Sequence, residues 1–373
     1  MKKMKMSEVA RLSIFLLLIL LLSRLASRSC RAKSEDMEKQ QVPLFVFGDS
    51  LFDAGNNNYI NTTTLYQANF PPYGETYFKL PTGRFCNGRL ISDFIAQYAN
   101  LPLIPPFLQP GLIEYQYGVN FASGGGGALV DTHPGEVIDL KTQLGYYKKV
   151  EAWFVHKFGN TEARKKLSEA VYLFSIGGND YLSIPLTNLS LVDSNYIAMV
   201  LGNLTTVMKE IYKSGGRKFA FTNMPDLGCL PFMRNFIGNG SCLVEASSIA
   251  KEHNKELSKL LVELEKQLKG FVYLLFDLNS SLQQRVENPS KYGFREGKSA
   301  CCGSGMFGGA YSCGGKRGEK KYKACDNPNE YVFWDSYHST EMTYKQLADQ
   351  MWSGVGNPHL TGSYNMKQLF QLD

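Results

Sequence analysis

The stretch LFVFGDSL, residues 44–51, joins an uninterrupted apolar run to a turn of Gly48, Asp49 and Ser50. Uninterrupted runs of this length are typical of strands covered on both faces, as in a parallel sheet. Comparable runs follow at residues 119–122, 171–176, 219–221 and 271–276. Helical patterns alternate with them, at residues 90–98, 140–157, 196–213, 244–268 and 340–352. The alternation predicts an α/β fold, a three-layer α/β/α sandwich with about five parallel strands and helices on both faces.

The composition is that of a globular chain with a near-neutral body. The 373 residues are 44% hydrophobic and 20% charged, which excludes a disordered or collagen-like protein. Of the formal net charge of +6, residues 1–33 contribute +7, from eight Lys or Arg and one Glu, which leaves −1 for the remainder. Phosphate binding draws its affinity from clustered cations. The body therefore offers no basic stripe to a nucleic-acid partner.

The N-terminus has the pattern of a secretory signal peptide. Basic residues up to Arg11 precede an apolar stretch at residues 12–22, and small residues follow from position 26. The apolar stretch is too short for a membrane anchor, because a helix needs about 20 residues to cross the hydrocarbon core. We expect a signal peptide within residues 1–32, with cleavage between positions 26 and 33, and a secreted single domain at residues 33–373. No later segment predicts a membrane span.

The cysteines predict disulfides, as expected for a secreted chain. Cys30 falls at the end of the leader, which leaves seven cysteines, an odd number. A zinc site would need paired C-x-x-C spacings, which the late cluster does not have. The bridges expected are Cys229 to Cys242, and Cys301 and Cys302 to Cys313 and Cys325 in either order. Cys86 is then the candidate free thiol.

Five N-x-S/T sequons could carry glycans in a secreted protein. They begin at Asn61, Asn188, Asn203, Asn239 and Asn279. This number is little more than chance in a chain rich in Asn, Ser and Thr, so the sequons support secretion only weakly.

Polar and glycine-rich turns follow the first three predicted strands. They contain Ser50, then the four glycines of residues 124–127, then Asn179. In a doubly wound sheet the ligand site lies off the carboxyl ends of the strands, so we expect these turns to meet at one edge. A serine on a tight turn, bare backbone N–H groups and an amide can attack an ester carbonyl and hold its oxyanion.

Attack by a serine also needs a general base, and the chain offers five histidines for this role. His156 and His253 fall in helical, Lys-rich stretches and are expected to be solvated, His359 to be peripheral, and His133 has acidic neighbours that do not distinguish it. His338 differs because Asp335 stands three residues before it in a predicted loop, where a carboxylate can orient the ring towards the serine.

Residues 300–330, rich in Gly, Lys and Cys, are expected to form a surface loop stapled by disulfides, and we call them the stapled segment. The charges of residues 316–323 are interpreted as a solvated face.

Four short blocks together resemble the plant GDSL esterase/lipase family, a branch of the SGNH hydrolases. They are GDSLFDAGNN at residues 48–57, VNFASGG at 119–125, IGGNDY at 176–181 and WDSYH at 334–338. Each block alone is weak, but the four occur in the family's order over nearly the whole mature chain. The resemblance implies the flavodoxin-like SGNH hydrolase fold and a serine ester hydrolase acting on lipid or other acyl esters, in the apoplast or cell wall.

Carried over residue by residue, the resemblance implies that Ser50 is the nucleophile, His338 the general base and then acid, and Asp335 the group that fixes the tautomer of His338. The oxyanion hole would use the Ser50 N–H, a glycine N–H and the Asn179 amide. Gly127 is favoured, and the other three glycines of residues 124–127 remain alternatives. No metal or organic cofactor is implied.

Two other functions stay open at this point. The same triad could pass the acyl group to an alcohol instead of water, as an acyltransferase does. A non-catalytic binding protein would have lost one of Ser50, Asn179, Asp335 or His338, and none is missing. The acyl chain length, the alcohol and the oligomeric state are not predicted.

Overall fold

The computed structural model describes residues 41–354, 356 and 358–372, of which residues 42 onward form one compact unit. The predicted signal peptide and Cys30 lie outside the described residues. Within the described part, no helix combines the length and the apolar character needed to cross a membrane.

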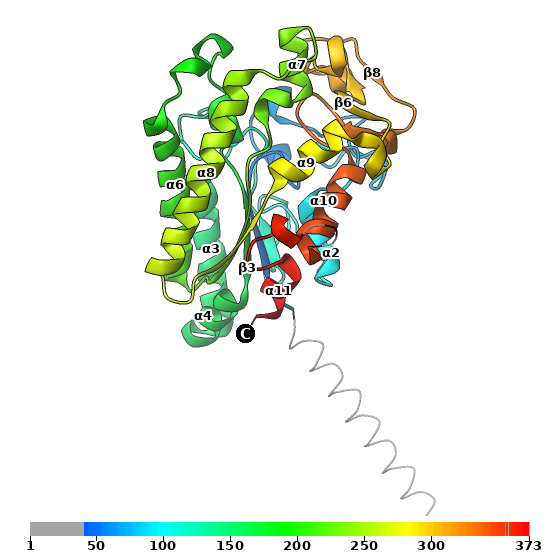
Figure 1. The fold of residues 1–373 in the computed structure, drawn as a ribbon. Helices are drawn as coiled ribbons and strands as arrows, with labels where there is room; N and C mark the ends of the chain where they lie inside the picture. Colours follow the sequence, from blue (N-terminus) through cyan, green and yellow to red (C-terminus); the bar gives the residue numbers. More distant parts are fainter. Residues whose placement is uncertain (1–40, 355, 357, 373) are drawn as a thin grey trace, which may run out of the picture. The chain divides into compact units, whose positions relative to one another are not determined.

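A five-stranded parallel sheet forms the middle layer (Figure 1). Its spatial order is β2-β1-β3-β4-β5. The strands are β1 (Leu44–Gly48), β2 (Gly118–Asn120), β3 (Val171–Ser175), β4 (Lys218–Thr222) and β5 (Val272–Phe276). Each lies on one of the five predicted apolar runs, and all pairings are parallel. The chain steps outward in both directions from β1 and β3, so the sheet is doubly wound, as predicted.

Helices cover both faces of this sheet, which confirms the three-layer α/β/α sandwich. One face packs against α3 (Leu140–Phe158), α4 (Asn160–Glu169), α6 (Ser194–Ser214) and α8 (Val244–Gln267). The other face packs against α2 (Ile91–Tyr98), α10 (Glu341–Ser353) and α11 (Met366–Gln371). In Figure 1 the two groups lie on opposite sides of β3.

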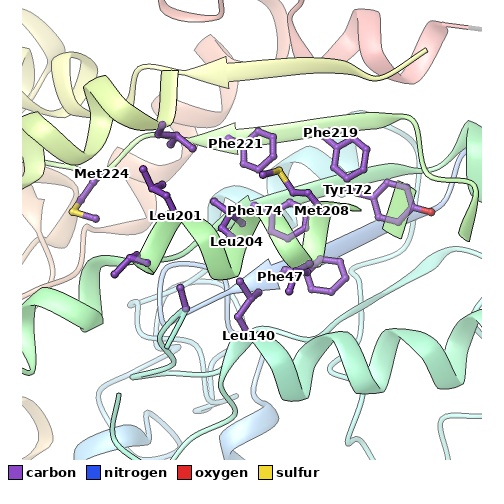
Figure 2. Packing of buried hydrophobic residues seen from close by; sticks show 14 of the residues in the cluster. Phe47, Leu140, Tyr172, Phe174, Leu201, Leu204, Met208, Phe219, Phe221 and Met224 are labelled. Carbon is purple, nitrogen blue, oxygen red and sulfur yellow. The ribbon is translucent and has the colours of Figure 1, made fainter. Parts of the chain in front are cut away.

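The two faces of the sheet differ in chemistry because side chains alternate along each strand. Odd-numbered β1 residues Phe45 and Phe47 enter the larger core, whereas Leu44 and Val46 enter the smaller one. On the larger core's face, aromatic rings from β1, β3 and β4 stack in a row; Phe174 lies 4.7 Å from Phe47, between ring centroids. Figure 2 shows these rings against apolar side chains of α6.

The five predicted helices agree with the structure to within two residues at each end. Their boundaries have physical causes: Asp139, Asp193 and Thr340 accept N-cap hydrogen bonds from the first turns of α3, α6 and α10. Five α-helices of the described residues were not predicted, and these are α4, α5 (Gly178–Leu182), α7 (Pro231–Ile237), α9 (Leu278–Glu287) and α11. Each of them has ten residues or fewer, and all are too polar or too short to show a clear helical period.

One pair of short strands borders the stapled segment and a second pair lies within it. Strand β6 (Glu296–Ala300) pairs in parallel with β9 (Tyr331–Phe333), and β7 (Cys302–Gly303) pairs antiparallel with β8 (Lys323–Ala324). The disulfides join Cys229 to Cys242, Cys301 to Cys325 and Cys302 to Cys313. Cys86 is the free cysteine among the described residues, and it is buried.

The aromatic row yields a stability prediction. Phe174→Ala is expected to lower the free energy of unfolding by about 3 to 5 kcal/mol, because a fully buried ring would leave a cavity between β1 and β4. Phe236→Ala, whose ring is 56% exposed on α7, is the matched control and should change stability by less than about 0.5 kcal/mol. Urea unfolding of both variants measures the difference. Equal losses would contradict the packing described here.

Candidate active site

Ser50 lies on a turn directly after β1, and close packing of β1 and β3 fixes where that turn begins. A Cβ on Gly48 would lie 2.2 Å from the carbonyl oxygen of Ser175, so only glycine fits. The next N–H, of Asp49, donates to that same oxygen. The N–H groups of Phe52 and Asp53 then donate back to the Asp49 carbonyl, which closes the turn around Ser50. The hydroxyl of Ser50 is thereby presented at the carboxyl edge of the sheet.

His338 and Asp335 lie beside Ser50 although 288 residues separate the serine from the histidine. His338 Nε2 is 2.7 Å from Ser50 Oγ, and His338 Nδ1 is 2.7 Å from Asp335 Oδ1. Because an ionised carboxylate only accepts hydrogen bonds, Nδ1 carries the proton and Nε2 is the acceptor for the serine hydroxyl. The three side chains therefore have the geometry of a nucleophile, a base and an orienting acid.

Asp335 is fully buried, and every oxygen of its carboxylate is occupied. Oδ1 accepts the N–H groups of Tyr337 and His338 as well as the imidazole, and Oδ2 accepts the hydroxyl of Tyr73 at 2.6 Å. Burial alone would raise the pKa of Asp335, but the His338 ring, the Arg317 guanidinium and the Tyr73 hydroxyl outweigh it and lower the pKa to about 2. The carboxylate is therefore ionised throughout the physiological pH range.

Asn179 and Asp180 come from the short helix α5 (Gly178–Leu182), which follows β3. Asn179 is half-buried, and its Nδ2 donates to the carbonyl of Gly126 at 3.0 Å. The buried Asp180 carboxylate accepts the N–H groups of Ala128 and Leu129 and the hydroxyl of Thr132. Together the two side chains tie α5 to the glycine-rich turn after β2.

The four glycines of that turn play different parts. The N–H of Gly124 donates to the Asp53 carboxylate, and the N–H of Gly126 donates to the Ser123 carbonyl. Gly127 packs against Asp180, where a Cβ would lie 2.6 Å from the carboxylate oxygen. Gly125, at φ +79°, is the glycine of the four that lines the cavity at Ser50.

Two further carboxyl groups are buried behind the serine turn. Burial raises the pKa of Asp49 to about 7, and the Leu51 N–H, which donates to Asp49, offsets this only in part. Burial also raises the pKa of Asp53 to about 6, although three backbone N–H groups donate to it. The protonation states of the two carboxyl groups therefore differ: Asp49 is largely neutral at mildly acidic pH, whereas Asp335 stays ionised.

A cavity of about 240 Å³ opens at Ser50, His338 and Asn179. One side of its wall is aliphatic and comes from the segments after β3 and β4. These residues are Ile176, Leu182, Met224, Pro225, Leu227 and Leu230. A second part of the lining is largely aromatic and comes from other loops. It consists of Leu65, Tyr66, Phe85, His133, Tyr311 and Tyr337.

Two expectations about the histidines change. His253 was expected to be solvated but is 2% exposed, because α8 turns it inward, where its Nδ1 lies 2.8 Å from the Tyr181 hydroxyl. Burial lowers its pKa to about 4. His133 lines the cavity, with Nδ1 2.9 Å from the Gly125 carbonyl, and no local spacing in the sequence indicated this. Within the described residues, no cluster of three or more His, Cys, Asp or Glu could hold a metal ion.

The interpretation of residues 316–323 as a solvated face is wrong for Arg317. Its side chain is 2% exposed and donates to the Tyr73 hydroxyl, whereas Lys316, Lys320 and Lys321 are exposed as expected. The sequence could not show this because the partners of Arg317 lie about 250 residues earlier in the chain.

The sequons differ in accessibility. Asn61, Asn188 and Asn239 are exposed. Asn203 and Asn279 are half-buried, and their side-chain amides donate to the carbonyls of Met199 and Met224.

Comparison with known proteins shows which sequences this chain resembles. The family of GDSL-like lipases/acylhydrolases matches residues 44–351. GDSL esterase/lipase 5 of Arabidopsis thaliana is 56% identical over 355 residues, which cover 93% of this chain and 92% of that protein. GDSL lipase of Tanacetum cinerariifolium is 48% identical over 89% of each chain. GDSL esterase/lipase 1 of A. thaliana is 48% identical over 91% of this chain and 93% of its own.

Asp49 yields a prediction about stability and pH. The pKa of Asp49 is raised from its ordinary value of 3.8 to about 7 in the folded chain. The stability that the protonated Asp49 contributes is therefore fully present below pH 3.8 and is lost as the pH rises through about 7. Asp49→Asn keeps the acceptor for the Leu51 N–H but cannot ionise. The free energy of unfolding of Asp49→Asn minus that of the wild type should therefore rise by roughly 3 kcal/mol from pH 4 to pH 8.

Urea unfolding at several pH values measures this gain. The burial of Asp53 is common to both proteins, so its own contribution largely cancels, whereas the repulsion between the Asp53 and Asp49 charges is part of the effect that Asp49→Asn removes. A difference that does not change with pH would contradict the buried, nearly neutral Asp49 described above.

Proposed function

The chain belongs to the family of GDSL-like lipases/acylhydrolases, a group of carboxylic ester hydrolases, and we propose that it is a secreted serine esterase that cleaves acyl esters through Ser50, His338 and Asp335. The observation that carries the proposal is the unbroken line of contacts from Ser50 Oγ through the His338 ring to Asp335 Oδ1, each 2.7 Å long. This line ends in a cavity large enough to admit an ester group.

The reaction follows from the protonation states. His338 Nε2 takes the proton of Ser50 as Oγ attacks the ester carbonyl, and a tetrahedral oxyanion forms. His338 then gives this proton to the leaving alcohol, and an acyl-serine remains. Water, deprotonated by the same nitrogen, releases the acid and restores Ser50. Asp335 keeps the tautomer and stabilises the imidazolium at both stages.

We propose that the oxyanion is held by the N–H of Ser50, the N–H of Gly125 and the amide of Asn179. The Gly124 carbonyl accepts a hydrogen bond from the buried Asn57 Nδ2 at 2.8 Å. In a trans peptide the N–H points opposite to the carbonyl, so this bond supports a Gly125 N–H turned away from Asn57. Gly127, favoured from the sequence, remains the alternative donor.

The cavity wall suggests how the substrate lies. The aliphatic side, built by the segments after β3 and β4, is suited to an acyl chain, because burying each methylene there contributes about 0.8 kcal/mol. A cavity that mixes apolar walls with a few convergent polar groups is typical of a small-molecule site. The acyl ester of a lipid is the substrate class that fits this division.

Secretion is supported by the leader, the three disulfides and the plant relatives. We place the mature enzyme outside the cell, in the apoplast or cell wall. The exposed Asn61, Asn188 and Asn239 are the proposed glycan sites; Asn203 and Asn279 are poorer acceptors because their amides are already bonded.

Ser50→Ala tests the nucleophile. Hydrolysis of p-nitrophenyl acyl esters of increasing chain length should fall by about 10³-fold or more at every length, since no acyl-enzyme can form. The melting temperature should stay nearly unchanged, because the hydroxyl is small and half-buried. Ser168→Ala, on α4 and remote from the cavity, is the control. Near wild-type turnover in the Ser50 variant would refute the triad.

Asn179→Ala tests the oxyanion hole. If the amide donates to the oxyanion, kcat should fall by about 10² to 10³-fold with little change in KM, because the bond strengthens only as charge develops. If Asn179 serves only to fasten the Gly126 carbonyl, the variant should instead lose about 1 kcal/mol of stability and keep its kcat per folded molecule. Measuring kcat on the folded fraction together with the melting temperature decides between the two.

A further inference from the structure

Two buried polar side chains stand behind Asp335, on the side away from His338. The Tyr73 hydroxyl donates to Asp335 Oδ2 at 2.6 Å, and Arg317 Nη1 donates to that same hydroxyl at 2.8 Å. Tyr73 is 1% exposed and Arg317 2% exposed. The line of hydrogen bonds that begins at Ser50 therefore continues through Asp335 to a buried cation.

The position of each partner is fixed by other contacts. The ring of Tyr73 packs edge-on against Phe70, Phe85 and Trp334. The remaining donors of Arg317 reach the carbonyls of Thr64, Gln67 and Cys313, and the ring of Tyr311 lies 4.1 Å from its guanidinium carbon. A guanidinium held by backbone carbonyls on three sides cannot turn to another anion.

The tyrosine hydroxyl has one donor and can accept in return, so its direction is set by its neighbours. Arg317 only donates, and an ionised carboxylate only accepts. The Tyr73 proton must therefore point at Asp335, with the hydroxyl oxygen turned to Arg317. This polarised arrangement strengthens both hydrogen bonds in a site of low dielectric.

We propose that Tyr73 and Arg317 are positioning residues of the reaction, which act through Asp335 to set the proton affinity of His338 and the orientation of its ring. The inference rests on the proposed function, since it assigns a role within that triad. Neither residue lies among the four blocks that pointed to the family, and neither needs to touch the substrate.

The physical effect has a definite sign. The Tyr73 hydrogen bond and the Arg317 charge both draw negative charge on Asp335 away from His338. If they are removed, more of that charge faces the ring, the imidazolium is favoured, and a higher pH is needed to free the base. The lowered pKa of Asp335 is consistent with this, because Arg317 and Tyr73 are among its causes, after burial and His338.

Other ionisable groups also face Asp335. These are Tyr337 and His338 on its own loop, Tyr344 on α10, Cys86 and Tyr73 from the segment before α2, and Tyr311 and Arg317 from the stapled segment. Burial raises the pKa of the tyrosines and of Cys86, so these groups stay neutral near pH 7. Arg317 and, when protonated, His338 are the cations of this set.

Tyr73→Phe is the sharpest test, since it removes one hydroxyl and leaves the packed ring. We expect kcat for a p-nitrophenyl ester to fall by about 10-fold with KM within about 2-fold. The acid limb of the kcat/KM profile should move to higher pH by roughly 0.5 to 1 unit. The matched control is Tyr147→Phe, which removes an equally buried hydroxyl, within hydrogen-bond distance of Tyr172 in the larger core of the sheet and outside the cluster that holds Tyr73. It should leave the limb in place.

Arg317→Gln and Arg317→Lys separate charge from packing. Both lose some of the bonds to backbone carbonyls, so both are expected to be less stable in urea. The acid limb should rise in the Gln variant and stay near the wild-type position in the Lys variant, which keeps the charge. Limbs that coincide with the wild type in Tyr73→Phe and Arg317→Gln would overturn the inference. The proposed function fails by a different result, an active Ser50→Ala variant.

Discussion

The site depends on one close contact between backbones, the approach of β1 to β3 at Gly48. The two strands pair in register there, and any side chain at position 48 would collide with the Ser175 carbonyl. Because that carbonyl also accepts the Asp49 N–H, the turn with Ser50 and the turn with Asn179 start from one fixed point. Gln143 clamps the same place from α3, as its amide bonds both the N–H and the carbonyl of Gly48. The proposed nucleophile and oxyanion donor thus both start from the edge of the sheet.

Around this fixed point, four buried carboxyl groups have different protonation because their partners differ. Asp335 has donors on both oxygens and a cation behind them, so it remains ionised. Asp49 has one backbone donor and lies near other carboxylates, so burial prevails and its pKa rises to about 7. Asp53 and Asp180 hold turns together by accepting backbone N–H groups. Asp49 lines the same cavity as Ser50, so an ionised Asp49 would oppose the proposed oxyanion and a neutral one fits the proposed chemistry.

The sequence predicts a residue's environment best where nearby residues set that environment, or where the residue is buried on all sides. Strands buried on both faces must be apolar throughout, which is why all five apolar runs became strands. Ser50 and Asn179 meet at one edge because the parallel strands β1 and β3 end there. Asp335 and His338 instead follow β9, outside the five-stranded sheet, and were singled out by their spacing. The environment of Arg317 and of His253 could not be inferred, since a Lys-rich stretch looks solvated whether or not one member turns inward. The partner that buries Arg317, Tyr73, stands 244 residues away. Only the folded chain brings them together.

The stapled segment shows how a polar, glycine-rich stretch can hold a buried cation. A chain of this composition has little apolar surface with which to fix its own shape. The Cys302–Cys313 bridge removes much of the freedom that the unfolded segment would have, and Arg317 follows four residues later, bonded to the Cys313 carbonyl. Such bridges persist in oxidising compartments, in keeping with the secretory leader. The Cys302–Cys313 bridge is therefore connected to the carboxylate of Asp335 through Arg317 and Tyr73.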